Sequence, residues 1–238
     1  GRAGGGVCFP GTRHFFHWRV ETGRSEPDGR PAMALQLTET EYVDEDFADV
    51  DLTGQELADI TFTGCDFTEA ALVGVHTRRV TFTDCRFRGT ELYDSTHRST
   101  SFASCTFERA ALHGMSLHGC RLTGSSFTDC RTRPLTIRDC DLTLVSLAGA
   151  NLAGVDLSGL RLREANLVRA DLSGCDLRGA DLTGARAERL NLTGADLRGA
   201  RVDAGLWVAA VLTGARVDID QAVLFAAAHG LAIGSAED

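Results

Sequence analysis

The residues of this 238-residue chain best suited to metal or thiol chemistry are its eight cysteines. Seven of them are separated by multiples of five residues: Cys65, Cys85, Cys105, Cys120, Cys130, Cys140 and Cys175. No pair has the C-x-x-C spacing that structural zinc sites use, so the cysteines do not predict a metal centre. Cysteines stacked about 5 Å apart could form disulfides, but a reducing cytosol favours free thiols, and we expect a cytoplasmic protein.

Serine, histidine and aspartate could support catalysis, but they show no catalytic pattern. No Ser-His-Asp order, phosphate-binding loop or paired-carboxylate motif stands apart from the regular spacing of the chain. We therefore expect no catalytic residue, no metal, no cofactor and a protein that is not an enzyme.

A period of five residues organises the chain from Phe47 to Val217. Of the 35 positions reached in steps of five, 31 hold Leu, Phe, Ile, Val or Trp. A small residue usually stands two positions before each of these centres, and Gly is common two positions after it, as in "ADLSG" and "ADLTG". A helix would scatter this pattern around its axis, and a strand would turn every second large residue to water.

A coil of four short segments and four corners explains the period. Each unit then presents one large and one small residue inward, and twenty residues complete one coil. About nine coils stacked at about 4.8 Å give a rod of roughly 42 Å. The cysteines fall on the small inward position, so we expect core thiols. Phenylalanines should stack on phenylalanines twenty residues away in two ladders: Phe47, Phe67, Phe87, Phe107 and Phe127, and Phe62, Phe82 and Phe102.

Two polar centres, Thr77 and His97, fall one coil apart on the same face. We expect an interior polar pair satisfied by backbone groups, or a local bulge, in preference to a small polar binding site. His113 and His118 should point outward at right angles to each other, which makes them a poor metal pair. Pro134 removes a backbone N–H beside the polar centre Thr132, so we expect a local distortion there, with a cis peptide bond as an option.

The repeat resembles that of the pentapeptide-repeat family, over about 175 residues. The resemblance implies an all-β solenoid, a right-handed quadrilateral β-helix. The segments "HRSTSFASCTFERAAL", "LRGADLTGAR" and "LWVAAVLTGARVDIDQAVLFAAAHGL" are similar to the MfpA-type fluoroquinolone-resistance branch of the family. That similarity implies a homodimer, joined at the C-termini, that mimics DNA, binds and inhibits DNA gyrase and protects it from quinolones. The related Qnr proteins project loops, which the unbroken repeat does not predict here.

The C-terminal stretch "DIDQAVLFAAAHG" predicts a short helix, started by Asp218 or Asp220 and ended by Gly230. It is apolar almost all round, so it needs a partner surface. It either caps the last coil or joins two chains, and outward apolar residues before it favour the dimer. The predicted dimer interface contains Leu206, Trp207, Val211, Val223, Leu224 and Phe225.

The charge pattern bears on the partner. The chain has a net charge of -9 and no lysine. Eleven acids and no arginine occupy residues 33–77, so the rod should repel nucleic acid and suit a basic groove on a protein. No stretch is long and apolar enough to predict a membrane span. Gyrase-facing candidates are the aspartate column and three aspartates near the expected dimer centre: Asp156, Asp176, Asp196, Asp203, Asp218 and Asp220. The alternative function is a scaffold that binds another protein through the same faces.

Three segments are expected. Residues 33–218 should form the β-helix, and residues 219–238 a helix and tail that cap the rod or join the dimer. Residues 1–32, rich in Gly and Arg, are interpreted as a disordered leader, a cloning remnant or a misassigned start before Met33. Their "RHFFHWR" stretch offers a less favoured alternative, a basic aromatic tail that binds nucleic acid.

Overall fold

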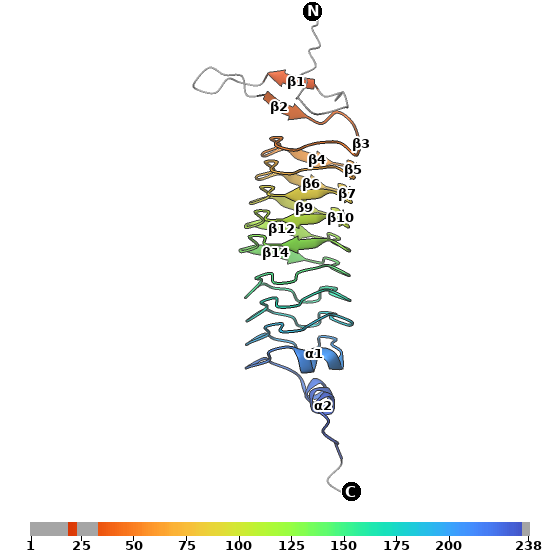
Figure 1. Ribbon diagram of the computed structural model, residues 1–238, viewed down its shortest axis with the longest axis vertical. Helices are drawn as coiled ribbons and strands as arrows, with labels where there is room; N and C mark the ends of the chain where they lie inside the picture. Colours follow the sequence, from red (N-terminus) through yellow and green to blue (C-terminus); the bar gives the residue numbers. More distant parts are fainter. Residues whose placement is uncertain (1–18, 23–32, 235–238) are drawn as a thin grey trace, which may run out of the picture.

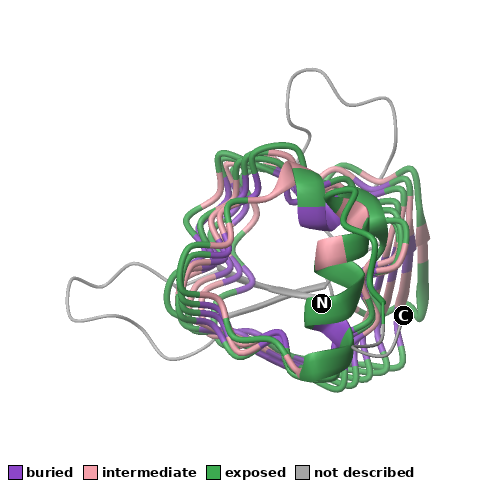
Figure 2. Ribbon diagram, turned by 90° about the horizontal axis from the view of Figure 1, so that it is seen from below, coloured by how far each residue is buried: buried purple, intermediate pink, exposed green. Residues whose placement is uncertain are grey.

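A computed structural model describes residues 19–22 and 33–234 of the chain, and it shows a four-sided β-helix closed at one end by two helices (Figure 1). We name each face of the helix after one of its inward residues: the Phe47, Leu52, Leu57 and Phe62 faces. Viewed along the rod in Figure 2, buried residues line the inside of the walls and exposed residues cover the outside.

Strands form on three of the faces. The Phe62 face contains β3 (Glu41–Val43), β5 (Thr61–Thr63), β7 (Thr81–Thr83) and β10 (Ser101–Ala103). The Phe47 face contains β8 (Arg86–Arg88), β11 (Thr106–Glu108) and β13 (Ser126–Thr128). The Leu57 face contains β4 (Glu56–Ala58), β6 (His76–Arg78), β9 (Thr96–Arg98), β12 (Met115–His118) and β14 (Leu135–Arg138).

Neighbouring coils pair in parallel with a step of twenty residues, which confirms the predicted four-sided β-helix. Only about five turns carry strands, fewer than the nine coils expected. Beyond β14, single bridges continue the same step as far as Asp196 and Arg216. The difference follows the sequence, because threonine and phenylalanine in segments such as "TFT" favour strands, whereas Ala-Asp-Leu-Ser-Gly units place more residues in turns.

Corners require a left-handed backbone. Gly154 and Gly174 occupy corners with φ of 74° and 65°. Asp49 takes the same corner position with φ of 58°. Asp tolerates this conformation better than most residues that carry a Cβ, and it is the commonest residue after Gly at the described left-handed corners, where Arg, Ser and Glu also occur.

The two phenylalanine ladders are present as predicted. Rings of Phe67 and Phe87 stack with centroids 5.1 Å apart and an angle of 6° between their planes. Phe62 and Phe82 stack at 5.0 Å and 7° in the second ladder. The ladders meet edge to face, as between Phe62 and Phe67 at 5.4 Å. This arrangement combines ring stacking with burial of large apolar side chains, and it forms the core of the first five coils.

The polar centres form a buried hydrogen-bonded network rather than a bulge. Thr77 and His97 remain in register between β6 and β9, and Thr77 Oγ1 lies 2.7 Å from His97 Nδ1. Ser95 Oγ lies 2.9 Å from His97 Nε2, and Thr100 Oγ1 lies 2.7 Å from Thr77 Oγ1. Burial lowers the pKa of His97 to about 3, so the ring is neutral. The expectation of an interior polar pair is confirmed, but the hydroxyl groups of Ser95 and Thr100 satisfy the pair instead of the expected backbone groups.

The cysteines of the repeat occupy the core, as expected. Six of the seven are buried, and Cys130 is half-buried. All seven are free thiols, and burial raises the pKa of Cys175 to about 11. Cys175 is therefore protonated at neutral pH, which makes it a poor nucleophile. Cys8 lies outside the described residues.

The coil around Pro134 is distorted, as predicted, and the Arg133–Pro134 peptide bond is cis. The ladder of the Leu52 face joins Ala111 to Arg131 and resumes between Asn151 and Asp171. Across the gap, the Thr132 hydroxyl donates to the Asn151 carbonyl at 2.6 Å. A second interruption was not anticipated. On the Leu57 face, the pairing between coils also stops after β14 and resumes with the bridge that joins Asp156 to Asp176.

The N-terminal end carries a separate pair of strands. β1 (Arg19–Thr22) pairs antiparallel with β2 (Met33–Gln36). Residues 33–36, which the sequence placed in the β-helix, therefore pair with β1 instead of a neighbouring coil. The other residues of the expected leader, including most of "RHFFHWR", lie outside the described residues.

Two helices close the C-terminal end. α2 (Ile219–Ala228) begins at Asp218 as predicted. α1 (Ala204–Ala209) was not anticipated, and it replaces the segment expected on the Phe47 face of the last coil. Because α1 turns Leu206 inward, this residue is 2% exposed, and the expectation that it lies on the surface is wrong.

Candidate partner-binding surface

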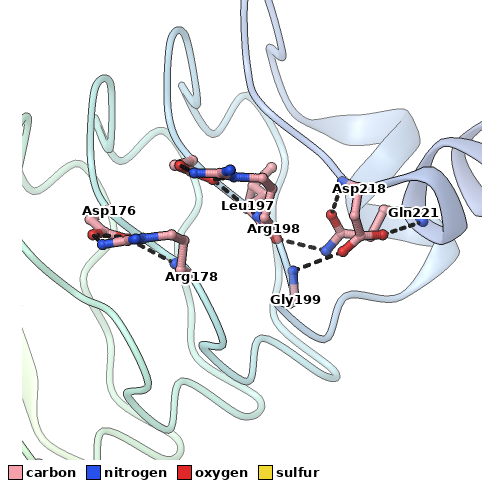
Figure 3. A network of polar contacts seen from close by, with 8 residues as sticks. Asp176, Arg178, Leu197, Arg198, Gly199, Asp218 and Gln221 are labelled. Carbon is pink, nitrogen blue, oxygen red and sulfur yellow. Dashed lines mark hydrogen bonds and ion pairs between the residues drawn. The ribbon is translucent and has the colours of Figure 1, made fainter.

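The aspartate column of the Leu57 face exists, but most of its charge is paired. Bridges join Asp156 to Asp176 and Asp176 to Asp196, which stacks the three residues on successive coils. Arg178 Nε lies 2.9 Å from Asp176 Oδ1, and Arg198 Nη2 lies 2.7 Å from Asp196 Oδ2 (Figure 3). The sequence placed each arginine two residues from its aspartate. In the structure, two nitrogens of each guanidinium group bond the carboxylate, which gives a fork-like ion pair.

These contacts keep the carboxylates ionised. Hydrogen bonds from the Arg198 guanidinium lower the pKa of Asp196 to about 2. The Arg178 guanidinium likewise lowers the pKa of Asp176, and the Ser158 hydroxyl lowers the pKa of Asp156. Asp156 accepts hydrogen bonds from Ser158 without an arginine partner. Its carboxylate is therefore the one in the column without an ion pair among the described residues, although it is attracted by Arg138 of the preceding coil.

The same face is basic in its strand-bearing half, a feature that the sequence reasoning missed. Arg78, Arg98 and Arg138 stand twenty or forty residues apart on β6, β9 and β14, and all three are exposed. Within the described residues none of them forms an ion pair. Counting cationic residues at the twenty-residue step, as was done for aspartates, would have found this column. The Leu57 face is therefore not uniformly anionic.

Free negative charge is concentrated in the first coils. Asp44, Asp46, Asp49 and Asp51 are exposed, and none of them forms an ion pair with a described residue. By contrast, opposite charges alternate in a column on the Phe62 face, where Asp141 lies 3.6 Å from Arg161 and Asp181 lies 4.0 Å from Arg201. The N-terminal acidic block is therefore an anionic surface whose aspartates are not neutralised by ion pairs among the described residues.

Two of the three aspartates predicted near the dimer centre serve the fold. Asp203 accepts a hydrogen bond from the Gly184 backbone N–H. Asp218 accepts from the N–H groups of Gln221 and Gly199, which lower the pKa of this carboxyl (Figure 3). Asp220 is exposed in the first turn of α2. Of these three, Asp220 offers the most accessible carboxylate.

Gln221 holds α2 on the end of the rod, and the sequence reasoning did not single it out. Its side chain completes a capping box by accepting from the Asp218 N–H at 3.0 Å. Its amide group donates to the carbonyls of Leu197 and Ala200 at 2.6 and 2.8 Å. The D-x-x-Q spacing at residues 218–221 was the available signal.

An apolar surface remains exposed around α2. Trp207 is buried in the end of the core and meets Phe225 edge to face at 6.1 Å, so it is not available to a partner. The outer side of α2 is exposed in Figure 2. We define the C-terminal apolar patch by its exposed side chains: Val208, Val211, Ile219, Val223, Leu224 and Phe225. Relative to the predicted interface, the patch loses Leu206 and Trp207 and gains Val208 and Ile219.

The remaining geometry bears on metals and membranes. Among the described residues, no group of three or more His, Cys, Asp or Glu side chains is placed to hold a metal ion. Neither helix has the length and hydropathy needed to span a bilayer within that part of the chain.

Comparison with known proteins identifies related folds. The family described as pentapeptide repeats matches residues 46–84, 62–96, 140–179 and 175–203. A trypsin-treated variant of QnrB1, a plasmid-mediated fluoroquinolone resistance protein, is 25% identical, with a TM-score of 0.72 over 82% of this chain and 97% of that chain. Full-length QnrB1 is 24% identical, with a TM-score of 0.70 over 80% of this chain and 97% of that chain. No curated protein sequence matches the chain.

Proposed function

The chain belongs to the pentapeptide-repeat family, and we propose that it binds DNA gyrase as a mimic of DNA, inhibits supercoiling and protects gyrase from fluoroquinolones. The observation that carries the proposal is the likeness to QnrB1 along nearly the whole of that resistance protein. Such a role needs a binding surface and no catalytic residue, so the protein acts without being an enzyme. We place it in the cytoplasm, where gyrase works.

Shape and charge support the DNA-mimic part of the proposal. Residues 33–238 hold 30 acids and 19 arginines, which gives a net charge of -11. Spread over roughly 42 Å of stacked coils, this is about one charge per 4 Å, compared with about one per 1.7 Å in duplex DNA. The rod is thus a diluted polyanion that a basic DNA-binding groove attracts and nucleic acid repels.

We propose that the contact surface for gyrase includes Asp156, Asp176 and Asp196, together with the aspartates near the C-terminus: Asp203, Asp218 and Asp220. Within this set, Asp156 and Asp220 contribute most, because neither carboxylate forms an ion pair with an arginine among the described residues. The acidic block of the first coils adds long-range attraction at the opposite end of the rod.

We also propose that two chains join through the C-terminal apolar patch. Exposed Ile219, Val223 and Leu224 give α2 an apolar outer side that its own chain leaves uncovered. Pairing two copies around a two-fold axis would bury this side and double the length of the mimic. DNA-binding grooves of dimeric enzymes suit such a symmetric rod.

The test is a supercoiling assay with purified gyrase, with and without a fluoroquinolone. We expect inhibition of supercoiling and fewer drug-stabilised double-strand breaks at micromolar protein. Loss of both effects in the folded protein would refute the gyrase proposal and favour a scaffold for another protein partner.

Paired variants test the contact surface. Asp156→Asn with Asp220→Asn should weaken inhibition roughly tenfold, as expected for the loss of two exposed charge pairs. Asp84→Asn with Asp129→Asn is the matched control, because it removes the same charge from exposed positions on other faces. Equal effects of the two double substitutions would show that only net charge matters.

A further inference from the structure

The distorted coil at Pro134 opens a crevice in the wall of the rod. The crevice has a volume of about 400 Å³ and is lined by His113, Cys130, Arg131, Thr132, Arg133 and Asn151. The site is a shallow depression that is largely open to solvent, not an enclosed pocket that buries most of a ligand. The lining residues come from three consecutive coils of the Leu52 face and the neighbouring corner, so the site is built by stacking rather than by one loop.

The opening has a physical cause in the hydrogen-bond ladder. In the following coils, the N–H groups of Asp171 and Asp176 donate to the carbonyls of Ala150 and Val155. The equivalent N–H group of Asn151 makes no such backbone bond within the described residues. The Asn151 carbonyl accepts a hydrogen bond from the Thr132 hydroxyl instead of from a backbone N–H. The wall therefore has a free backbone donor beside the crevice.

The crevice is cationic. Arg131 and Arg133 are exposed, and neither lies within ion-pair distance of a carboxylate among the described residues. Arg133 Nη1 only approaches Asn151 Oδ1, at 3.5 Å. This differs from Arg163, Arg178, Arg198 and Arg201 of the later coils, which all pair with aspartates.

An acidic residue on the same face, Asp171, attracts Arg133 without forming an ion pair with it. Asp171 stands in the column of Arg131 and Asn151, and it accepts hydrogen bonds from the Ser173 N–H at 3.0 Å and from Asn191 Nδ2 at 3.0 Å. His113 completes the rim from the other side, where its ring stacks on Tyr93 at 4.9 Å. The stack restrains the imidazole ring beside the crevice.

We propose that this crevice binds a phosphate group, supplied by inorganic phosphate or by a small phosphorylated molecule. Two guanidinium forks suit a tetrahedral oxyanion, because each can donate two parallel hydrogen bonds to adjacent oxygens. The His113 ring and the free N–H of Asn151 supply further donors. The inference is independent of gyrase binding, since the crevice uses none of the proposed contact residues.

Isothermal titration of the full chain tests the proposal. Sodium phosphate and adenosine monophosphate are titrated separately at constant ionic strength set with sodium chloride. We expect saturable binding that weakens at least tenfold in Arg131→Gln and in Arg133→Gln. Similar affinity for both probes would assign the site to the phosphate alone, and tighter binding of adenosine monophosphate would assign it to a phosphorylated molecule.

Matched controls separate a site from general attraction. Arg121→Gln changes the residue that precedes a centre, as at Arg131, and Arg98→Gln changes the residue that follows one, as at Arg133. Both controls should leave binding unchanged. Absence of saturable binding, or equal weakening in all four variants at unchanged melting temperature, would overturn the proposal.

Discussion

Replacing His97 by leucine should remove a large part of the acid sensitivity of the rod. His97 is 1% exposed, and burial lowers its pKa from 6.5 to about 3. Between these two values the unfolded chain binds a proton that the folded protein does not. The stability of the folded protein is therefore unaffected by this group above about pH 6.5 and decreases as the pH falls below it.

The magnitude follows from the linkage slope of about 1.4 kcal/mol per pH unit for one proton. On going from about pH 7 to about pH 4.5, His97 should cost the native protein about 2 to 3 kcal/mol. At neutral pH, His97→Leu loses the hydrogen bonds to Thr77 and Ser95, so the variant should be less stable there by about 1 to 3 kcal/mol. The stability curves of the two proteins should thus converge as the pH falls.

Urea unfolding at a series of pH values measures this difference directly, because acid effects common to both proteins cancel. His113→Gln is the control, since it removes a half-buried histidine that forms no ion pair among the described residues. The unfolding free energy of this control should differ from that of the native protein by the same amount at every pH. A constant difference in unfolding free energy between the native protein and His97→Leu at all pH values would refute the account of the buried network.

Three further substitutions test the core, the helix cap and the patch. Phe87→Ala removes a ring that is 0% exposed and stacked on both sides, so it should lower the unfolding free energy by about 3 to 5 kcal/mol, measured by urea titration. Gln221→Ala leaves the carbonyls of Leu197 and Ala200 without their donor, and a loss of about 1 to 3 kcal/mol is expected in the same assay; no loss would show that water replaces the amide. Phe225→Asp places a charge in the C-terminal apolar patch and should give a monomer by light scattering, and an unchanged dimer would refute the proposed interface.

The sequence predicted the coil and its core because the period of five is itself the geometry of the fold. Once the period is known, Phe62 must face Phe82, and Thr77 must face His97. The ion pairs were harder to predict, since a column of aspartates and the arginines two residues away are equally visible in the sequence. Whether Arg178 folds back on Asp176 depends on side-chain conformation rather than on spacing.

The C-terminal helix α1 shows where the pattern misleads. Trp207 and Leu212 keep the five-residue step, so the sequence pattern of the repeat continues through a segment that folds as a helix. Leu206, an apolar residue at an outward position, was the sign of a change, and it was interpreted as an interface residue. Tertiary packing against the open end of the rod overrides the repeat there.

The most direct test of the central claim is a competition between this protein and DNA for gyrase. Fluorescence anisotropy of a labelled DNA duplex bound to purified gyrase is followed as the protein is added. We expect full displacement of the duplex, with an apparent affinity that weakens as salt concentration rises, because both ligands would use the same basic groove. Formation of a ternary complex, with the duplex still bound at saturating protein, would contradict the claim that the rod mimics DNA.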